Sequence, residues 1–128
     1  DDTHSIQPYL EFMTEVLETT LPLLNSERGL ACWVIGDVQQ LNLAKEVWES
    51  VASKIEIKDG KGNTVRYRLL GIVEDRINDL EKVTRIWNSE NDKSGKATAI
   101  DRILIICSNN ARPSAIIQNN EIKWAPLQ

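Results

Sequence analysis

The feature that most constrains the fold is the apolar stretch at residues 30–38, LACWVIGDV. An unbroken apolar run predicts a β-strand buried on both faces of a mostly parallel sheet, because a half-exposed strand would alternate polar and apolar residues. Amphipathic helical patterns flank it, so we expect a helix–strand–helix segment of an α/β sheet. In such sheets ligands bind at the carboxyl ends of strands, which makes Gly36 and Asp37 candidate crevice residues. A plain strand-to-helix turn is the simpler alternative.

The composition excludes several classes of protein. A chain of 128 residues predicts one domain, and a net charge of −4 means that nucleic-acid binding would need a local basic strip. No apolar run is long enough to cross a bilayer, and one His with two separated Cys does not make the usual zinc pattern. Cys32 and Cys107 each lie in an apolar run, which predicts buried, reduced thiols and a cytoplasmic protein.

Helical periodicity is found on both sides of the first strand. Residues 5–24 carry an apolar stripe at three- and four-residue spacing, with Ser5 as the expected cap, and residues 42–54 carry a second one that begins at Asn42. Residues 55–69 alternate around the turn sequence DGKGN, which predicts a hairpin whose second arm continues as a strand to residue 75.

Residues 76–99 predict a long loop with basic character. Loops of this length in a compact domain are usually functional or disordered, and a plain surface excursion is the simpler alternative. A second strand buried on both faces follows at 100–107, and residues 115–124 predict a terminal hairpin around Asn119 and Asn120.

Three segments carry a resemblance to a known family: residues 9–38, with YLEFM and VIGDV at their ends, then KVTRIW at 82–87 and GKATAIDRIL at 95–104. Together with the element order they resemble the carboxyl-terminal part of the catalytic domain of DNA amino-methyltransferases. These enzymes methylate adenine N6 or cytosine N4 with S-adenosylmethionine. The resemblance implies a partial Rossmann-like methyltransferase sheet (helix–strand–helix–strand–strand) whose last strand is antiparallel. Residues 103–107 would then lie between 30–35 and 69–73.

The family's acidic-Pro-Pro-aromatic motif and its Gly-rich cofactor loop are absent from this chain. Without them, nothing holds the flipped base or the methionine end of the cofactor. We therefore expect no catalytic residue here, and S-adenosylmethionine binding only in the whole enzyme. The missing amino-terminal half, a partner chain or a second copy is expected to cover the sheet edge beside 30–35.

The resemblance also implies site residues. In the complete enzyme Gly36 and Asp37 would form the crevice rim, and the loop would contact DNA through its basic residues, with Trp87 beside the base or cofactor. The expected DNA-contacting residues are Lys82, Arg85, Trp87, Lys96 and Thr98.

Two other interpretations remain open. The first is a non-catalytic α/β interaction domain that uses the loop and the terminal hairpin. The second is a small complete enzyme, whose acid/base candidates would be His4, Asp37, Glu74 and Asp75. The pair Asp101–Arg102 is interpreted as a structural ion pair at a strand start.

Overall fold

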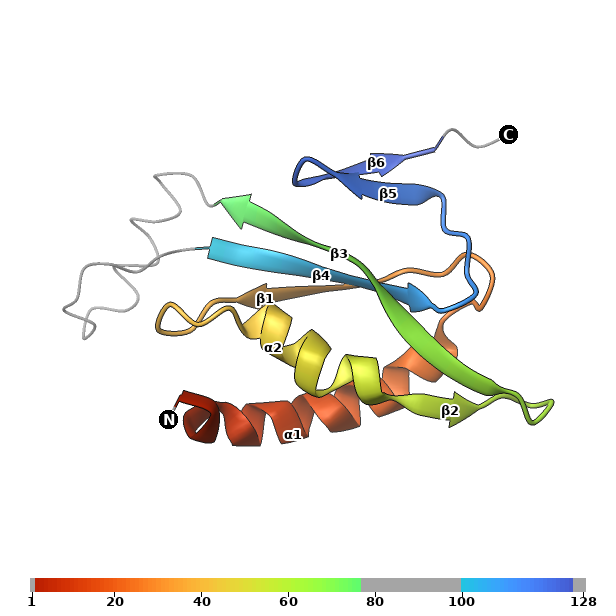
Figure 1. Ribbon diagram of the computed structural model, residues 1–128, viewed down its shortest axis with the longest axis horizontal. Helices are drawn as coiled ribbons and strands as arrows, with labels where there is room; N and C mark the ends of the chain where they lie inside the picture. The colour runs from red at the N-terminus through yellow and green to blue at the C-terminus, as the bar shows by residue number, and fades with distance from the viewer. Residues whose placement is uncertain (1, 77–99, 126–128) are drawn as a thin grey trace.

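The computed structural model describes residues 2–76 and 100–125 (Figure 1). In chain order the elements are α1 (Asp2–Thr20), the 3-10 turn η1 (Leu21–Leu23), β1 (Ala31–Gly36), α2 (Leu43–Ser50), the 3-10 turn η2 (Ala52–Lys54), β2 (Glu56–Lys58), β3 (Thr64–Arg76), β4 (Ile100–Ser108), β5 (Ala115–Gln118) and β6 (Glu121–Trp124).

Four of the strands form one sheet in the order β1-β4-β3-β2, and every neighbouring pair is antiparallel. The mixed α/β character is as expected, but the mostly parallel sheet predicted from the first strand is wrong. The predicted place of β4 is confirmed, since it lies between β1 and β3 and is antiparallel to both. It follows that β1 and β3 run in the same direction on either side of it.

The two helices build the core on one side of the sheet, here called the inner face. Helix α1 begins earlier than expected, at Asp2, and its buried residues Ile6, Leu10, Met13 and Leu17 recur at three- and four-residue spacing. Helix α2 is capped by Asn42, whose side-chain oxygen accepts a hydrogen bond from the Lys45 amide at 3.0 Å. It packs against the sheet, and α1 runs alongside (Figure 1).

The outer face of the sheet is only partly covered. The β5–β6 hairpin lies over β3, with the Ile117 side chain against Gly71, and Ile105 and Cys107 of β4 are buried there. No described element covers β1 on this face, and Val34 is 67% exposed. Burial on both faces, predicted for both apolar strands, is therefore wrong for β1.

The two cysteines differ in burial in the same way as the strands that carry them. Both are free thiols, and Cys107 is buried as predicted, but Cys32 is exposed on β1. An apolar run shows only that a strand can be buried on both faces. Whether both faces are buried depends on which helices and strands pack against them, and these come from distant parts of the sequence.

Within the described part of the chain, no helix is long and apolar enough to cross a membrane.

Candidate functional site

The carboxyl end of β1 leads into a strained turn. Val38 and Leu41 pair across it, and the two residues between them, Gln39 and Gln40, have φ angles of 51° and 67°. This left-handed conformation costs a residue with a Cβ atom about 1–2 kcal/mol. The rest of the fold therefore holds the turn that follows Gly36 and Asp37 in place.

Asp37 is bound by Arg102 of β4, the strand that lies between β1 and β3. Arg102 is opposite Ile35 on β1 and Glu74 on β3. Its Nε and Nη2 donate to Asp37 Oδ1 and Oδ2 at 2.8 and 3.1 Å, and its Nη1 donates to Glu74 Oε1 at 2.8 Å. The fork on Asp37 is the geometry in which guanidinium and carboxylate bind most strongly.

This cluster of Asp37, Arg102 and Glu74 is protected from water to different degrees. The side chain of Asp37 is 6% exposed, that of Arg102 15% and that of Glu74 33%. The hydrogen bonds from Arg102 to Asp37 raise the pKa of the guanidinium, and the bond to Glu74 adds to this effect, whereas burial opposes it. Arg102 therefore remains charged, and the cluster ties the ends of β1, β4 and β3 together.

The hydrogen bonds of Arg102 to Asp37 and Glu74 form a structural ion-pair cluster. Both carboxylate oxygens of Asp37 already accept hydrogen bonds from Arg102, so this residue is poorly placed to move protons. The predicted pairing of Arg102 with Asp101 is wrong in its partner. Asp101 lies on the outer side of β4, where its Oδ1 would be 3.1 Å from a Cβ atom at Gly36.

The other acid/base candidates do not gather into one site. Glu74 belongs to the Arg102 cluster, whereas Asp75 lies opposite Asp101 in the sheet register. His4 lies in α1, and its side chain is outside the described residues. Among the residues that the structure describes, no group of His, Cys, Asp or Glu could hold a metal ion.

A groove of about 350 Å³ runs beside this end of β1. It is lined by Ile6 and Tyr9 of α1, by Val34, Ile35 and Gly36 of β1, and by Val38 and Leu43 beyond it. None of these side chains is charged. Burial raises the pKa of Tyr9, so its hydroxyl is neutral at physiological pH and can serve as a hydrogen-bond donor.

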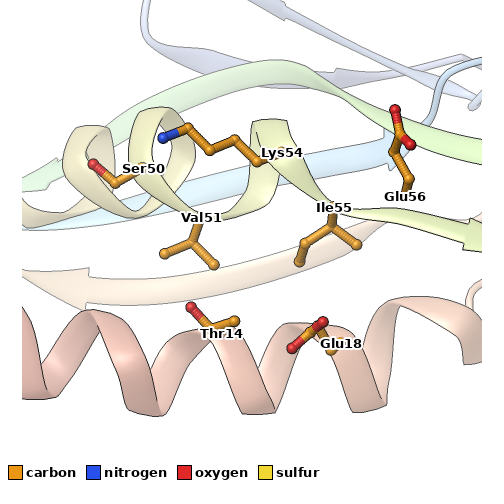
Figure 2. A pocket seen from close by; sticks show the side chains of 7 residues that line it. All are labelled: Thr14, Glu18, Ser50, Val51, Lys54, Ile55 and Glu56. Atoms are coloured by element: carbon orange, nitrogen blue, oxygen red, sulfur yellow. The ribbon is translucent and has the colours of Figure 1, made fainter.

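A second depression, of about 270 Å³, lies between α1 and the segment from α2 to β2. Figure 2 shows Val51 and Ile55 pointing toward Thr14 and Glu18 of α1, and Ser50, Lys54 and Glu56 also line the depression. The Thr14 hydroxyl donates to the Leu10 carbonyl of its own helix at 2.8 Å. In Figure 2 the side chains of Glu18, Lys54 and Glu56 point in different directions.

Of the two residues expected at the crevice rim, Gly36 ends β1 and lines the groove, and Asp37 directly follows it. The residues expected to contact DNA, Lys82, Arg85, Trp87, Lys96 and Thr98, all lie outside the described residues.

Comparison with models of known protein families, with curated proteins and with solved structures gives no match for this chain. The geometry and the residues themselves therefore carry the functional argument.

Sequence reasoning missed the Arg102 cluster and the groove. One signal could have indicated the cluster, because an arginine next to the apolar run of β4 is buried only when its charge is paired. The identity of its partners depends on strand register, which the sequence alone does not reveal.

Proposed function

We propose that this chain is the carboxyl-terminal part of an S-adenosylmethionine-dependent DNA amino-methyltransferase that requires a separate cofactor-binding half. The observation that supports the proposal is the strand order. β4 lies antiparallel between β1 and β3, which run in the same direction. This is the arrangement that the sequence resemblance implies for the last three strands of such an enzyme.

In this proposal the chain contributes scaffold and DNA contacts. The Arg102 cluster holds the ends of three strands in register, so Gly36 and the turn after Asp37 keep a fixed position at the crevice rim. Lys82, Arg85 and Lys96 supply positive charge for the DNA backbone, and Trp87 and Thr98 lie beside them in the sequence. The cofactor and the catalytic motif belong to the other half.

The test measures DNA binding and cofactor binding by the 128-residue chain. Fluorescence anisotropy with labelled duplex DNA across a salt series should show binding that weakens as salt rises. The double variant Lys82→Ala/Arg85→Ala should lower the slope of log K against log salt by about 1.8, since each phosphate contact contributes about 0.9. A matched control is Lys45→Ala/Lys58→Ala, which removes two exposed lysines elsewhere and should leave the slope unchanged.

Calorimetry with S-adenosylmethionine should detect no binding by this chain alone. Micromolar binding would show that the chain carries a complete cofactor site. Absence of DNA binding at low salt would contradict the assignment to a DNA-modifying enzyme.

The second candidate is a non-catalytic interaction domain, favoured by the open edge of β1 and the apolar groove beside it. It differs from the first in predicting no salt-dependent binding of DNA.

A further inference from the structure

On the side of β1 away from β4, the backbone groups have no partner strand among the described residues. The Asp37 amide donates to the Ile100 carbonyl at 3.2 Å, which continues the register in which Gly36 lies opposite Asp101. Backbone groups in an antiparallel pair alternate in direction, so Ile35, Trp33 and Ala31 also turn theirs toward β4. Cys32, Val34 and Gly36 turn theirs away, and no described strand pairs with that side.

The sequence of β1 carries none of the residues that normally prevent strand addition. β1 contains no Pro and no charged residue, and its register with β4 is continuous from Ala31 to Gly36. The opposite edge of the sheet is different. There β2 has only three residues, two of which are the charged Glu56 and Lys58. The edge formed by β2 is thus protected against strand addition by its shortness and its charges, whereas the residues of β1 give its edge no such protection.

The groove described above lies directly against the open edge. Val34, Ile35 and Gly36 form one wall, and Ile6 and Tyr9 of α1 form another. Figure 1 shows α1 running along β1 on the side away from β4. Phe12, three residues after Tyr9 on the same flank of α1, is 59% exposed. The backbone edge therefore has an uncharged, apolar surface beneath it.

We propose that this edge and groove form a docking site for one extended strand of another polypeptide segment, with an apolar side chain of that strand seated in the groove. Strand addition gives affinity through backbone hydrogen bonds, and pockets for alternate side chains give specificity. The inference does not rest on the methyltransferase proposal, because it uses only the backbone groups of β1 and the lining of the groove.

A single strand fits this site better than a second copy of the chain. In a two-fold pair joined through β1, each protomer would bring its own α1 to the same edge, and the two helices would compete for the space beneath the junction. Helix α1 also carries Glu11, Glu15 and Glu18 but no Lys or Arg, so two copies would repel each other. A single uncharged strand brings neither a second α1 helix nor further acidic side chains to this edge.

The test supplies a strand in cis. Figure 1 places the start of α1 near the carboxyl end of β1, so a donor strand joined to residue 1 through a Gly-Ser linker can reach the edge. The probe is the full chain with Thr-Val-Thr-Val-Thr attached. One control carries Thr-Pro-Pro-Pro-Thr, which cannot pair, and another carries Thr-Asp-Thr-Asp-Thr, which places charge at the groove.

Amide hydrogen exchange followed by NMR gives the readout residue by residue. With the valine strand, exchange should slow about tenfold at Cys32, Val34 and Gly36, because a short linker gives a millimolar effective concentration. Trp33 and Ile35 serve as internal references, since their amides already point toward β4. The proline and aspartate strands should give no such protection.

Two results would overturn the proposal. The first is equal exchange at Cys32, Val34 and Gly36 with all three strands attached. The second is slow exchange at these amides in the unextended chain together with a dimer mass by light scattering, which would show that a second copy occupies the edge.

Discussion

The side-chain amide of Asn120 pairs with the backbone of Glu74. Its Nδ2 donates to the Glu74 carbonyl at 3.0 Å, and its Oδ1 accepts from the Glu74 amide at 2.6 Å. Asn120 therefore takes the place of a neighbouring strand residue and fixes the tip of the β5–β6 hairpin on β3. Glu74 in turn accepts from Arg102, so the hairpin is connected to the cluster at the end of β1.

Replacing Asn120 by Gly should loosen the hairpin. Glycine keeps the left-handed conformation, in which Asn120 has a φ of 59°, but it loses both hydrogen bonds to Glu74. Since a net hydrogen bond contributes about 0.5–1.5 kcal/mol, we expect a loss of about 1–3 kcal/mol in urea unfolding. The control is Asn119→Gly, which has a φ of 53° and should change stability much less. Equal losses in both variants would mean that the amide pairing contributes nothing.

Removal of Arg102 should be among the most destabilising single changes. Arg102→Ala leaves the Asp37 carboxylate, 6% exposed, without its partner. Breaking a buried pair in this way costs about 3–5 kcal/mol, whereas an exposed pair contributes about 0–1 kcal/mol. Arg66→Ala is the matched control, because Arg66 pairs with Glu56 at the surface. Chemical denaturation of both variants gives the comparison.

The double variant Asp37→Ala/Arg102→Ala separates charge from packing. If the loss in Arg102→Ala comes from an uncompensated buried carboxylate, the double variant should be less destabilised than the sum of the two single variants. Simple additivity would show that the two side chains act independently.

The Arg102 cluster shows which contacts could be predicted from the sequence and which could not. A central position for β4 was predictable from its long apolar run, whereas its antiparallel place between β1 and β3 was implied only by the family resemblance. The partners of Arg102 were not predictable, because Glu74 becomes its neighbour only through a register that contains a shift between Leu69 and Gly71. A residue inserted into one strand changes which side chains meet, and the apolar pattern does not show it.

The site beside β1 was predictable in part for a similar reason. Gly36 and Asp37 follow an apolar strand, and this placed them at its carboxyl end. Their surroundings depend on α1, which supplies Ile6 and Tyr9 to the groove, and on a turn formed by Gln39 and Gln40. Glutamine gives no sequence signal for a left-handed turn, so neither the strain nor the groove was visible beforehand.

Stability at acid pH should depend on Asp59. Hydrogen bonds from the backbone amides of Asn63 and Lys61 lower the pKa of its carboxyl below the ordinary value. A lowered folded-state pKa contributes stability above the unfolded pKa, near pH 4, and this contribution is lost as the pH falls through the folded value. Asp59→Asn should flatten that part of the curve of melting temperature against pH, whereas Asp75→Asn serves as the comparison. An unchanged curve in Asp59→Asn would contradict this origin.

The two thiols should differ in reactivity. Cys32 is exposed and Cys107 is buried, and burial raises the pKa of both. At neutral pH the thiolate fraction of Cys32 is therefore below that of free cysteine, so its labelling by a disulfide reagent should be slower than that of a free thiol. We expect one thiol to react in the native chain and the second only in denaturant, with Cys32→Ser abolishing the native reaction. Rapid labelling of both thiols would contradict the burial of Cys107.

The contact between Gly71 and Ile117 provides a test of how the hairpin is seated. A Cβ atom at Gly71 would come within 2.7 to 2.9 Å of three side-chain atoms of Ile117, closer than carbon atoms can approach. Gly71→Ala should therefore displace the hairpin or strain the sheet, at the cost of about 1–3 kcal/mol that is typical of overpacking. The double variant Gly71→Ala/Ile117→Ala makes room for the new methyl group and should recover part of that loss. If the double variant is instead less stable than Gly71→Ala by the full cost of truncating Ile117, the two side chains do not meet and the hairpin lies elsewhere.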